Sequence, residues 1–194
     1  MSLPAAMGGE TEPAWTPGQL HRWEREQGTP YEFAGADPVA MNGGSLRHSR
    51  IALSMAVALD TRLDFNRFEV VRGDAKIIVN NHLRYPDVVV FHNTGDLGTD
   101  IAPSPVVVVE VLSRSTRRVD QYDKNVDYAA TPSIQHYVML SQERRAAVVC
   151  SRRAGRWRAE ELDGEDPLRL DAVDVEVPFS EIYRRITFGD EWFF

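Results

Sequence analysis

The spacing of apolar residues along the chain predicts where helices form. Apolar residues recur at helical spacing within 46–63, directly after Ser45, a residue type that often caps helix N-termini. The first 18 residues are rich in Gly, Pro and Ala and have no such period, so we expect a flexible lead-in over 1–18. Shorter helical patterns predict helices at 20–27, 116–130 and 179–186.

From Phe68 onward the apolar period changes to two, which is typical of strands. The segment 106–112 is almost wholly apolar, as expected of a strand buried on both faces of a sheet. Further extended segments are predicted at 29–33, 68–72, 75–79, 87–91, 136–140, 145–150, 157–162 and 168–177. The three segments between 68 and 91 favour a hairpin or meander. The order of helices and strands predicts one α/β domain over 19–194, with a mixed central β-sheet flanked by helices.

Composition excludes several classes of protein. Apolar residues make up 43% and charged residues 26%, so the chain is neither disordered nor fibrous. No apolar run approaches the ~20 residues of a membrane-spanning helix, and the start lacks the pattern of a secretory signal. We therefore expect a cytoplasmic protein that makes no membrane contact. The single cysteine, Cys150, excludes an internal disulfide and a cysteine-based zinc cage.

Charge is distributed unevenly around a net value of −7, which argues against nucleic-acid binding driven by overall charge. Residues 114–158 carry a net charge of +6, while 1–113 carry −5 and 159–194 carry −8. The arginines of this basic middle segment have two interpretations. They are either solvated positions of strands and turns or a local surface that faces phosphate groups.

The 22 basic residues comprise 20 arginines and only two lysines, Lys76 and Lys124. Lys76 falls in an ordinary strand position with no evident role. Lys124 lies on the predicted helix 116–130, where Asp120 and Tyr128 are each four residues away and share its face. One interpretation of Lys124 is an exposed helix lysine paired with Asp120. The other is a lysine with a function, because in a chain that uses arginine almost everywhere a lysine is an unusual choice for a surface charge.

Two carboxylates occupy positions where a charge is costly. Glu110 interrupts the apolar strand 106–112, where an ionised group must be paired or bind a metal. Asp87 begins a strand directly after Pro86, which cannot donate to a β-ladder and so favours a strand start. If these residues have no catalytic or metal-binding role, Glu110 pairs with an interior arginine and Asp87 is a residue of a strand start or turn. If the two strands are neighbours, both carboxylates can ligate one Mg²⁺ through oxygen.

At these positions the sequence resembles the Uma-type family of restriction-endonuclease-like proteins, within the PD-(D/E)XK nuclease superfamily. The resemblance covers about residues 20–186. It is carried by Tyr85 to Val90, by Val107 to Ser113 with Ser115 and Thr116, and by Asp120, Lys124 and Tyr128. Further matching positions are Tyr31 to Phe33, Ser45, His48 and His136 to Val138.

The resemblance implies a restriction-endonuclease-like core and a metal site for Mg²⁺ or Mn²⁺. Asp87 and Glu110 would be the metal ligands, together with the carbonyl of Val111, and Lys124 would act at the phosphate. In the usual pattern of the superfamily the lysine stands two residues after the acid, where this chain has Leu112. Lys124 resembles the displaced lysine of this family, which reaches the same place from the adjoining helix.

Four further residues are candidates for supporting roles. Glu32 is either a third carboxylate, holding water or a second metal, or a surface strand residue. His48 is either a base or a structural histidine at the start of its helix. Asp120 is expected to orient Lys124, and Tyr128 to pack in the core with its hydroxyl group bonded.

The resemblance implies a metal-dependent nuclease that acts on DNA, with arginines of 114–158 touching the DNA backbone. A second hypothesis is a catalytically silent nucleic-acid-binding or dimeric interaction module on the same fold, because the net charge is acidic and no lysine follows Glu110 by two residues. A third is a small-molecule hydrolase on the same core. The aromatic tail Trp192 to Phe194 favours a homodimer.

Overall fold

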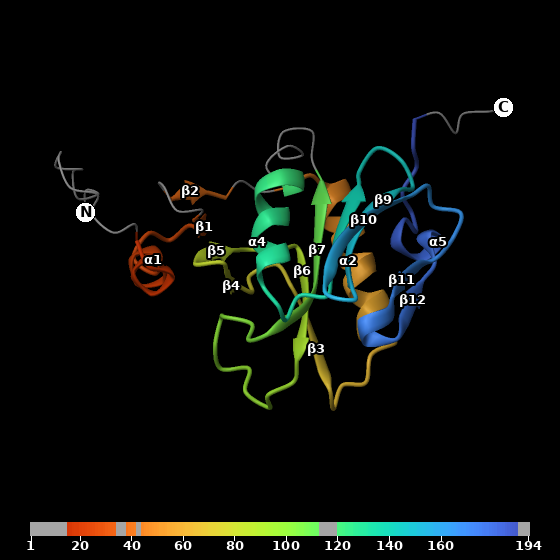
Figure 1. Ribbon diagram of the computed structural model, residues 1–194. Coiled ribbons are helices and arrows are strands. Elements are labelled where there is room, and N and C mark those ends of the chain that lie inside the picture. The colour runs from red at the N-terminus through yellow and green to blue at the C-terminus, as the bar shows by residue number, and fades with distance from the viewer. Residues whose placement is uncertain (1–14, 34–37, 42–43, 113–119, 190–194) are drawn as a thin grey trace.

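A six-stranded sheet forms the centre of the molecule in the computed structural model, which describes residues 15–33, 38–41, 44–112 and 120–189 (Figure 1). The strand order is β10-β9-β8-β7-β6-β3. The strands are β3 (Phe68–Arg72), β6 (Val88–His92), β7 (Pro105–Leu112), β8 (His136–Ser141), β9 (Ala147–Arg153) and β10 (Arg156–Leu162). Neighbouring strands are antiparallel except β7 and β8, which are parallel. This arrangement confirms the predicted mixed central sheet.

Strand β7 lies inside the sheet, and all eight of its residues are buried. From Val107 onward its side chains alternate between two hydrophobic cores, as the pleat requires. Val109 and Val111 belong to one core, and Val108 and Leu112 belong to the other. Glu110 therefore lies on the same face of the sheet as Val108 and Leu112.

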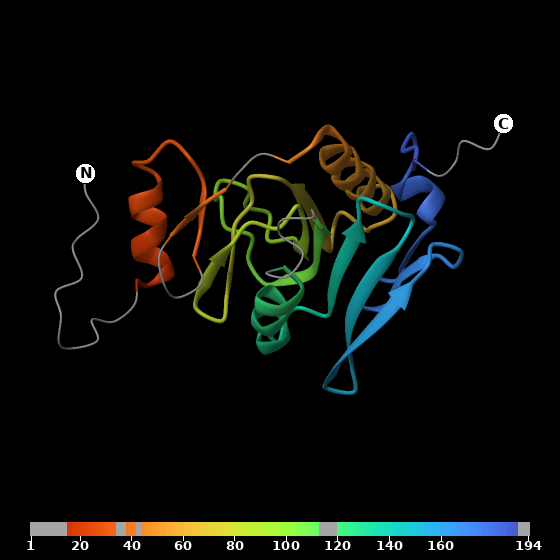
Figure 2. The same ribbon diagram turned by 90° about the horizontal axis from the view of Figure 1, so that it is seen from above.

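Helices cover both faces of this sheet, as Figure 2 shows. Helix α2 (Leu46–Asp60) covers one face, and its N-cap Ser45 accepts the backbone N–H of His48. The opposite face is covered by η1 (Asp120–Lys124), a π-helical turn, and by α4 (Asn125–Ala130), which follows it directly. The α2 face also carries β11 (Leu168–Leu170), the 3₁₀ turn η2 (Asp171–Val173), β12 (Val175–Val177) and α5 (Phe179–Ile182).

A third group of elements, drawn at the left of Figure 1, packs beside α4. It contains α1 (Pro17–Glu24), β1 (Tyr31–Glu32), β2 (Val39–Ala40), β4 (Ile77–Val79) and β5 (His82–Arg84). Leu20, Phe33, Leu83 and Tyr85 form its own small core. Phe33 and Leu83 exchange two backbone hydrogen bonds of 3.0 and 3.1 Å, which join β1 to β5.

The structure corrects the predicted hairpin or meander of the three segments between 68 and 91. Strand β3 pairs with β6, while β4 and β5 form a separate hairpin between them in the sequence. The reason is the turn at Asn80 and Asn81, where φ is 47° and 62°. Two successive left-handed residues make a tight hairpin turn, so the chain reverses at once and β5 begins where a connection was expected.

Several element boundaries also differ from the sequence patterns. Helix α1 begins at Pro17 with Thr16 as its N-cap, within the expected lead-in, of which 1–14 lie outside the described residues. The predicted strand 168–177 is interrupted by η2. The predicted helix 116–130 begins, within the described residues, as a π-helical turn. None of the helices described is long and apolar enough to cross a membrane.

Candidate active site

Asp87 and Glu110 come together where the pairing of β6 with β7 ends. The last register pair is Val88 with Val109, so Asp87, one residue earlier, lies towards Glu110. Asp87 Oδ2 accepts the backbone N–H of Val111 at 2.7 Å and lies 3.1 Å from His48 Nε2. The Asp87 carboxylate is thus held directly beside the backbone of the strand that carries Glu110.

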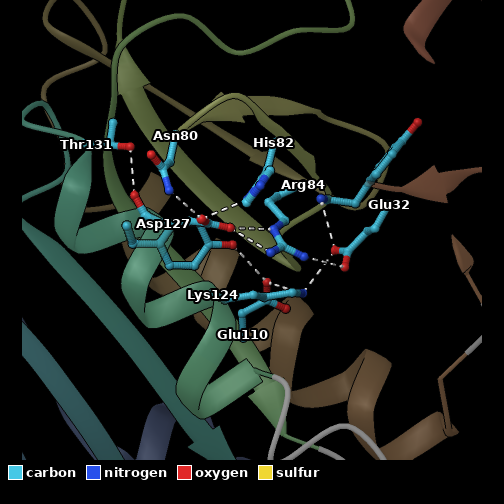
Figure 3. A network of polar contacts seen from close by, with 10 residues as sticks. Glu32, Asn80, His82, Arg84, Glu110, Lys124, Asp127 and Thr131 are labelled. Atoms are coloured by element: carbon cyan, nitrogen blue, oxygen red, sulfur yellow. Dashed lines mark hydrogen bonds and ion pairs between the residues drawn. The ribbon is translucent and has the colours of Figure 1, made fainter. Parts of the chain in front are cut away.

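Glu110 is 5% exposed, and the elements of the opposite layer supply its partners. Its Oε1 accepts a hydrogen bond from Lys124 Nζ at 2.8 Å (Figure 3). It accepts another from the Tyr128 hydroxyl group at 3.3 Å. Lys124 ends η1 and Tyr128 lies one turn later in α4, so both side chains reach the same carboxylate. Tyr128 is fully buried, as predicted, and its ring packs against Tyr137 with 4.7 Å between centroids.

Lys124 is buried and bridges two carboxylates. It is 5% exposed, and its Nζ lies 3.0 Å from Glu32 Oε1 as well as 2.8 Å from Glu110 Oε1. The interpretation of Lys124 as an exposed helix lysine is therefore wrong. The role predicted for Asp120, to orient Lys124, concerns a side chain outside the described part of the chain.

Glu32 is not an isolated surface residue of β1. Its Oε1 accepts the backbone N–H of Tyr85 at 3.2 Å, and its Oε2 lies 3.7 Å from Arg84 Nη1. Glu32 therefore has two cationic neighbours, Lys124 and Arg84. Its position joins the group of elements around α1 to the carboxylates at the edge of the sheet.

Asp127, which the sequence patterns did not single out, anchors the next part of this network (Figure 3). Its Oδ2 accepts two hydrogen bonds from Arg84, at 3.0 Å from Nε and 2.6 Å from Nη2. Its Oδ1 lies 2.8 Å from His82 Nδ1 and accepts Asn80 Nδ2 at 3.0 Å. Burial raises the pKa of Asp127, but these hydrogen bonds outweigh burial and hold its pKa below the ordinary value. Asp127 follows Lys124 by three residues, and this spacing was the only signal in the sequence.

His48 approaches Asp87 from the first turn of α2, and a glycine makes room for its ring. A Cβ atom at Gly44 would lie 2.7 Å from His48 Nδ1, closer than real contacts allow. Ser45 Oγ also donates to Gln142 Oε1 at 2.9 Å, and Gln142 Nε2 donates to the carbonyl of Leu112 at 3.0 Å. The start of α2 is thereby tied to the end of β7.

Lys76 belongs to a second buried network, so the expectation that it occupies an ordinary strand position is wrong. Its Nζ donates to Asp100 Oδ2 at 2.8 Å and lies 3.1 Å from His21 Nδ1. Glu24 Oε2 is also 2.8 Å from Nζ, at ion-pair distance but outside hydrogen-bond geometry. Both lysines of the chain are thus buried, and each neutralises two carboxylates.

The arginines of the basic middle segment do not share one surface. Arg152 donates to three backbone carbonyls around the end of α4, and Arg153 pairs with Asp171 at 3.6 Å. In the sheet register, Glu110 lies level with Met139 and Val148, and the β9–β10 turn lies roughly 20 Å further along the strands. Arg144 and Arg145, between β8 and β9, lie at the Asp87 end, while 114–119 lie outside the described residues.

The donor atoms of this site fit a hard divalent cation. Within the described ranges no three His, Cys, Asp or Glu side chains converge on one point. Mg²⁺ does not need three, because one or two carboxylates and several waters usually complete its shell. Asp87 and Glu110 supply two carboxylates. The Val111 N–H points to Asp87, and in an extended strand the carbonyl of the same residue points to the same side.

Comparisons with known proteins agree with this description. The chain matches the model of the Uma2 family, described as "Putative restriction endonuclease", over residues 17–180. It is 30% identical over 180 residues to the uncharacterized protein slr1290 of Synechocystis sp., covering 91% of this chain and 95% of that protein. Its fold is similar to that of a putative nuclease belonging to DUF820 from Anabaena variabilis, with a TM-score of 0.71 and 12% identity. That match covers 87% of this chain and 97% of the other.

Proposed function

The chain belongs to the Uma2 family of putative restriction endonucleases, and we propose that it is a metal-dependent phosphodiesterase that cleaves DNA. Asp87, Glu110 and the carbonyl of Val111 would hold Mg²⁺ or Mn²⁺, since carboxylate and carbonyl oxygens suit these ions. When bound, such an ion supplies Lewis acidity at the phosphate and a nucleophilic water at neutral pH.

The side chains around the cation site divide the remaining work. Lys124 stabilises the negative charge that develops on the phosphate. His48 holds the carboxylate of Asp87 through the contact at Oδ2, so Asp87 is oriented from two sides by His48 and the Val111 N–H. Arg144 and Arg145, at the same end of the sheet, contact the DNA backbone and account for binding despite the net charge of −7.

One observation carries this proposal: Lys124 Nζ lies 2.8 Å from Glu110 although the two residues are 14 positions apart. Leu112 stands where the superfamily pattern has its lysine, and it points into a hydrophobic core. In the proposed site Lys124, the last residue of the π-helical turn η1, takes the role of that lysine. A lysine that merely balanced charge on the surface would not be buried against a strand glutamate.

Cleavage of plasmid and oligonucleotide DNA with Mg²⁺ or Mn²⁺ tests the proposal. We expect the wild type to cleave, and Asp87→Asn, Glu110→Gln and Lys124→Ala each to lose activity by about a hundredfold or more. Asp171→Asn is the matched control, because Asp171 is exposed and lies on the far part of the α2 face. Cleavage that persists unchanged in Asp87→Asn would exclude this site.

The silent nucleic-acid-binding module is the second candidate. It is favoured by the pairing of Glu110 with Lys124, which neutralises the carboxylate within the protein. Calorimetry with Mn²⁺ separates the two candidates, since a silent module would bind DNA without binding the metal at millimolar concentration. Binding of the metal that depends on Asp87 supports the phosphodiesterase.

A further inference from the structure

We propose that Lys124 is the built-in counter-ion of Glu110, and that a divalent cation displaces its ammonium group from Glu110 while Glu32 retains it. Lys124 is then a group that becomes available to the phosphate only when the metal is present. This inference rests on the proposed function, because it requires a cation that binds Glu110.

The first step of the argument is the geometry around Lys124. Its Nζ lies 2.8 Å from Glu110 Oε1 and 3.0 Å from Glu32 Oε1, so one ammonium group separates two carboxylates (Figure 3). Glu110 and Lys124 are both almost fully buried. A buried carboxylate this close to a second, partly buried one needs a cation near it, and in the protein without metal Lys124 supplies it.

The second step is that the ammonium group and a metal ion compete for Glu110. Glu110 Oε1 already accepts two hydrogen bonds, from Lys124 and from Tyr128. A dication on the same carboxylate repels the ammonium group, and the buried surroundings screen this repulsion weakly. Metal binding to Glu110 and contact of Lys124 with Glu110 therefore oppose each other.

The third step is that Glu32 has its own support and remains in place. It comes from β1, and its Oε1 also accepts the Tyr85 N–H at 3.2 Å. Arg84 lies 3.7 Å from Oε2, and Arg84 is itself fixed by Asp127. Glu32 can therefore hold the ammonium group after Glu110 is given to the cation. Glu32 is a positioning residue for Lys124.

The two-lysine composition allows a direct test on the wild-type protein. Protein labelled with ¹⁵N in its lysine side chains should give two ammonium signals, from Lys76 and Lys124. Lys76 is a matched internal control, because it is also buried and also contacts two carboxylates, Glu24 and Asp100. The Lys124→Gln variant assigns the signals.

Titration with Mg²⁺, which is diamagnetic, should shift the Lys124 signal and increase its hydrogen exchange with water, while the Lys76 signal stays constant. In Glu32→Gln the Lys124 signal should broaden or disappear at saturating Mg²⁺, because its retained partner is weakened. A Lys124 signal that does not move while calorimetry shows Mg²⁺ binding would overturn the displacement and leave the metal site intact.

A second measurement tests whether the Lys124 ammonium group and the metal ion compete for Glu110. Replacing Lys124 with Met or Gln removes the competing charge, so Mn²⁺ should bind about tenfold more tightly than to the wild type. Lys124→Gln keeps a hydrogen-bond donor for Glu110 and serves if Lys124→Met does not fold. Equal or weaker Mn²⁺ binding in a folded variant would contradict the proposal.

The outcomes separate this inference from the proposed function. If the wild type and the Lys124 variants bind neither Mg²⁺ nor Mn²⁺, both proposals fall. If Mg²⁺ shifts the Lys124 signal but DNA is not cleaved, the displacement of Lys124 is supported and the proposed nuclease activity is rejected.

Discussion

At the scale of single residues, His136 shows how burial controls a titratable group. It is 3% exposed in β8, its Nδ1 lies 3.0 Å from Ser151 Oγ, and its Nε2 accepts the Ala172 N–H at 3.2 Å. A ring nitrogen that accepts a backbone N–H carries no proton, so the ring is neutral. Burial lowers the pKa of His136 to about 4; the charge of Asp171 opposes this shift and that of Arg153 adds to it.

This shift predicts a loss of stability in mild acid. In the unfolded chain His136 titrates near its ordinary pKa of 6.5, so the unfolded state takes up the proton first as the pH falls. Above about pH 6.5 the neutral His136 ring contributes roughly 3 kcal/mol to the free energy of unfolding. This contribution is lost as the pH falls to about 4. Urea unfolding at several pH values measures it. The stability difference between wild type and His136→Gln should shrink as the pH falls through this range. Parallel plots of unfolding free energy against pH for the two proteins would contradict the prediction.

Gly44 gives a second prediction for a single residue. In Gly44→Ala the new Cβ would collide with the His48 ring, because it would lie 2.7 Å from Nδ1, and should move the imidazole away from Asp87. We expect a changed His48 ring signal in NMR spectra and a loss of cleavage between about tenfold and a hundredfold. Gly18→Ala is the control, because nothing lies within 4 Å of a Cβ at that position. An unchanged His48 signal would show that the ring tolerates the methyl group.

At the scale of elements, Asp127 fastens α4 to the β4–β5 hairpin. Its carboxylate is contacted by Asn80, His82 and Arg84, all from the hairpin, and Thr131 donates to its backbone carbonyl at 2.9 Å. The carboxylate neutralises the charge of the buried Arg84. Burial alone would lower the pKa of Arg84, but its contacts with Asp127 and Glu32 raise its pKa above the ordinary value.

Asp127→Asn removes this compensation and leaves Arg84 with a buried charge. We expect the free energy of unfolding to fall by about 3–5 kcal/mol, since breaking a buried ion pair leaves its partner unpaired. Denaturant unfolding measures the change. Asp123→Asn is the control, because Asp123 is exposed in the adjacent turn η1. Equal stability of the two variants would mean that the hairpin does not depend on Asp127.

At the scale of the whole molecule, the Lys76 network joins α1 to the segment that carries Tyr85 and Asp87, directly before β6. Glu24 of α1 accepts the Tyr31 N–H at 2.7 Å, and its Oε1 also accepts the Tyr85 hydroxyl group. The Tyr85 N–H donates in turn to Glu32. Burial lowers the pKa of Lys76, but its contacts with Asp100 and Glu24 raise it above the ordinary value, so Lys76 stays charged.

Lys76→Met should therefore loosen α1. Without the ammonium group, Glu24 is a buried carboxylate that has lost its cation, and we expect a destabilisation of about 3–5 kcal/mol. Hydrogen exchange should increase first in 17–24 and remain slow in β7. Arg22→Met, an exposed position of α1, is the control. Uniform loss of protection across both segments would show that α1 does not open separately.

The sequence alone determined much of this architecture, because regular burial leaves a periodic pattern. Helix α2 and its cap at Ser45 follow from apolar residues at helical spacing, and β7 follows from an unbroken apolar run. The position of Glu110 within that run already identified a buried carboxylate. The resemblance at Asp87, Glu110 and Lys124 identified the family that the comparisons show.

Only the tertiary structure decided which charges meet. The turn at Asn80 and Asn81 removed β4 and β5 from the central sheet, which placed Arg84 beside Asp127 and Glu32. The sequence also did not reveal the partners of Lys76, because they lie 24 or more residues away in the chain. Periodicity reports which face of an element is buried. It does not report the partner across that face, because partners of a buried charge come from distant segments that folding brings within hydrogen-bond distance.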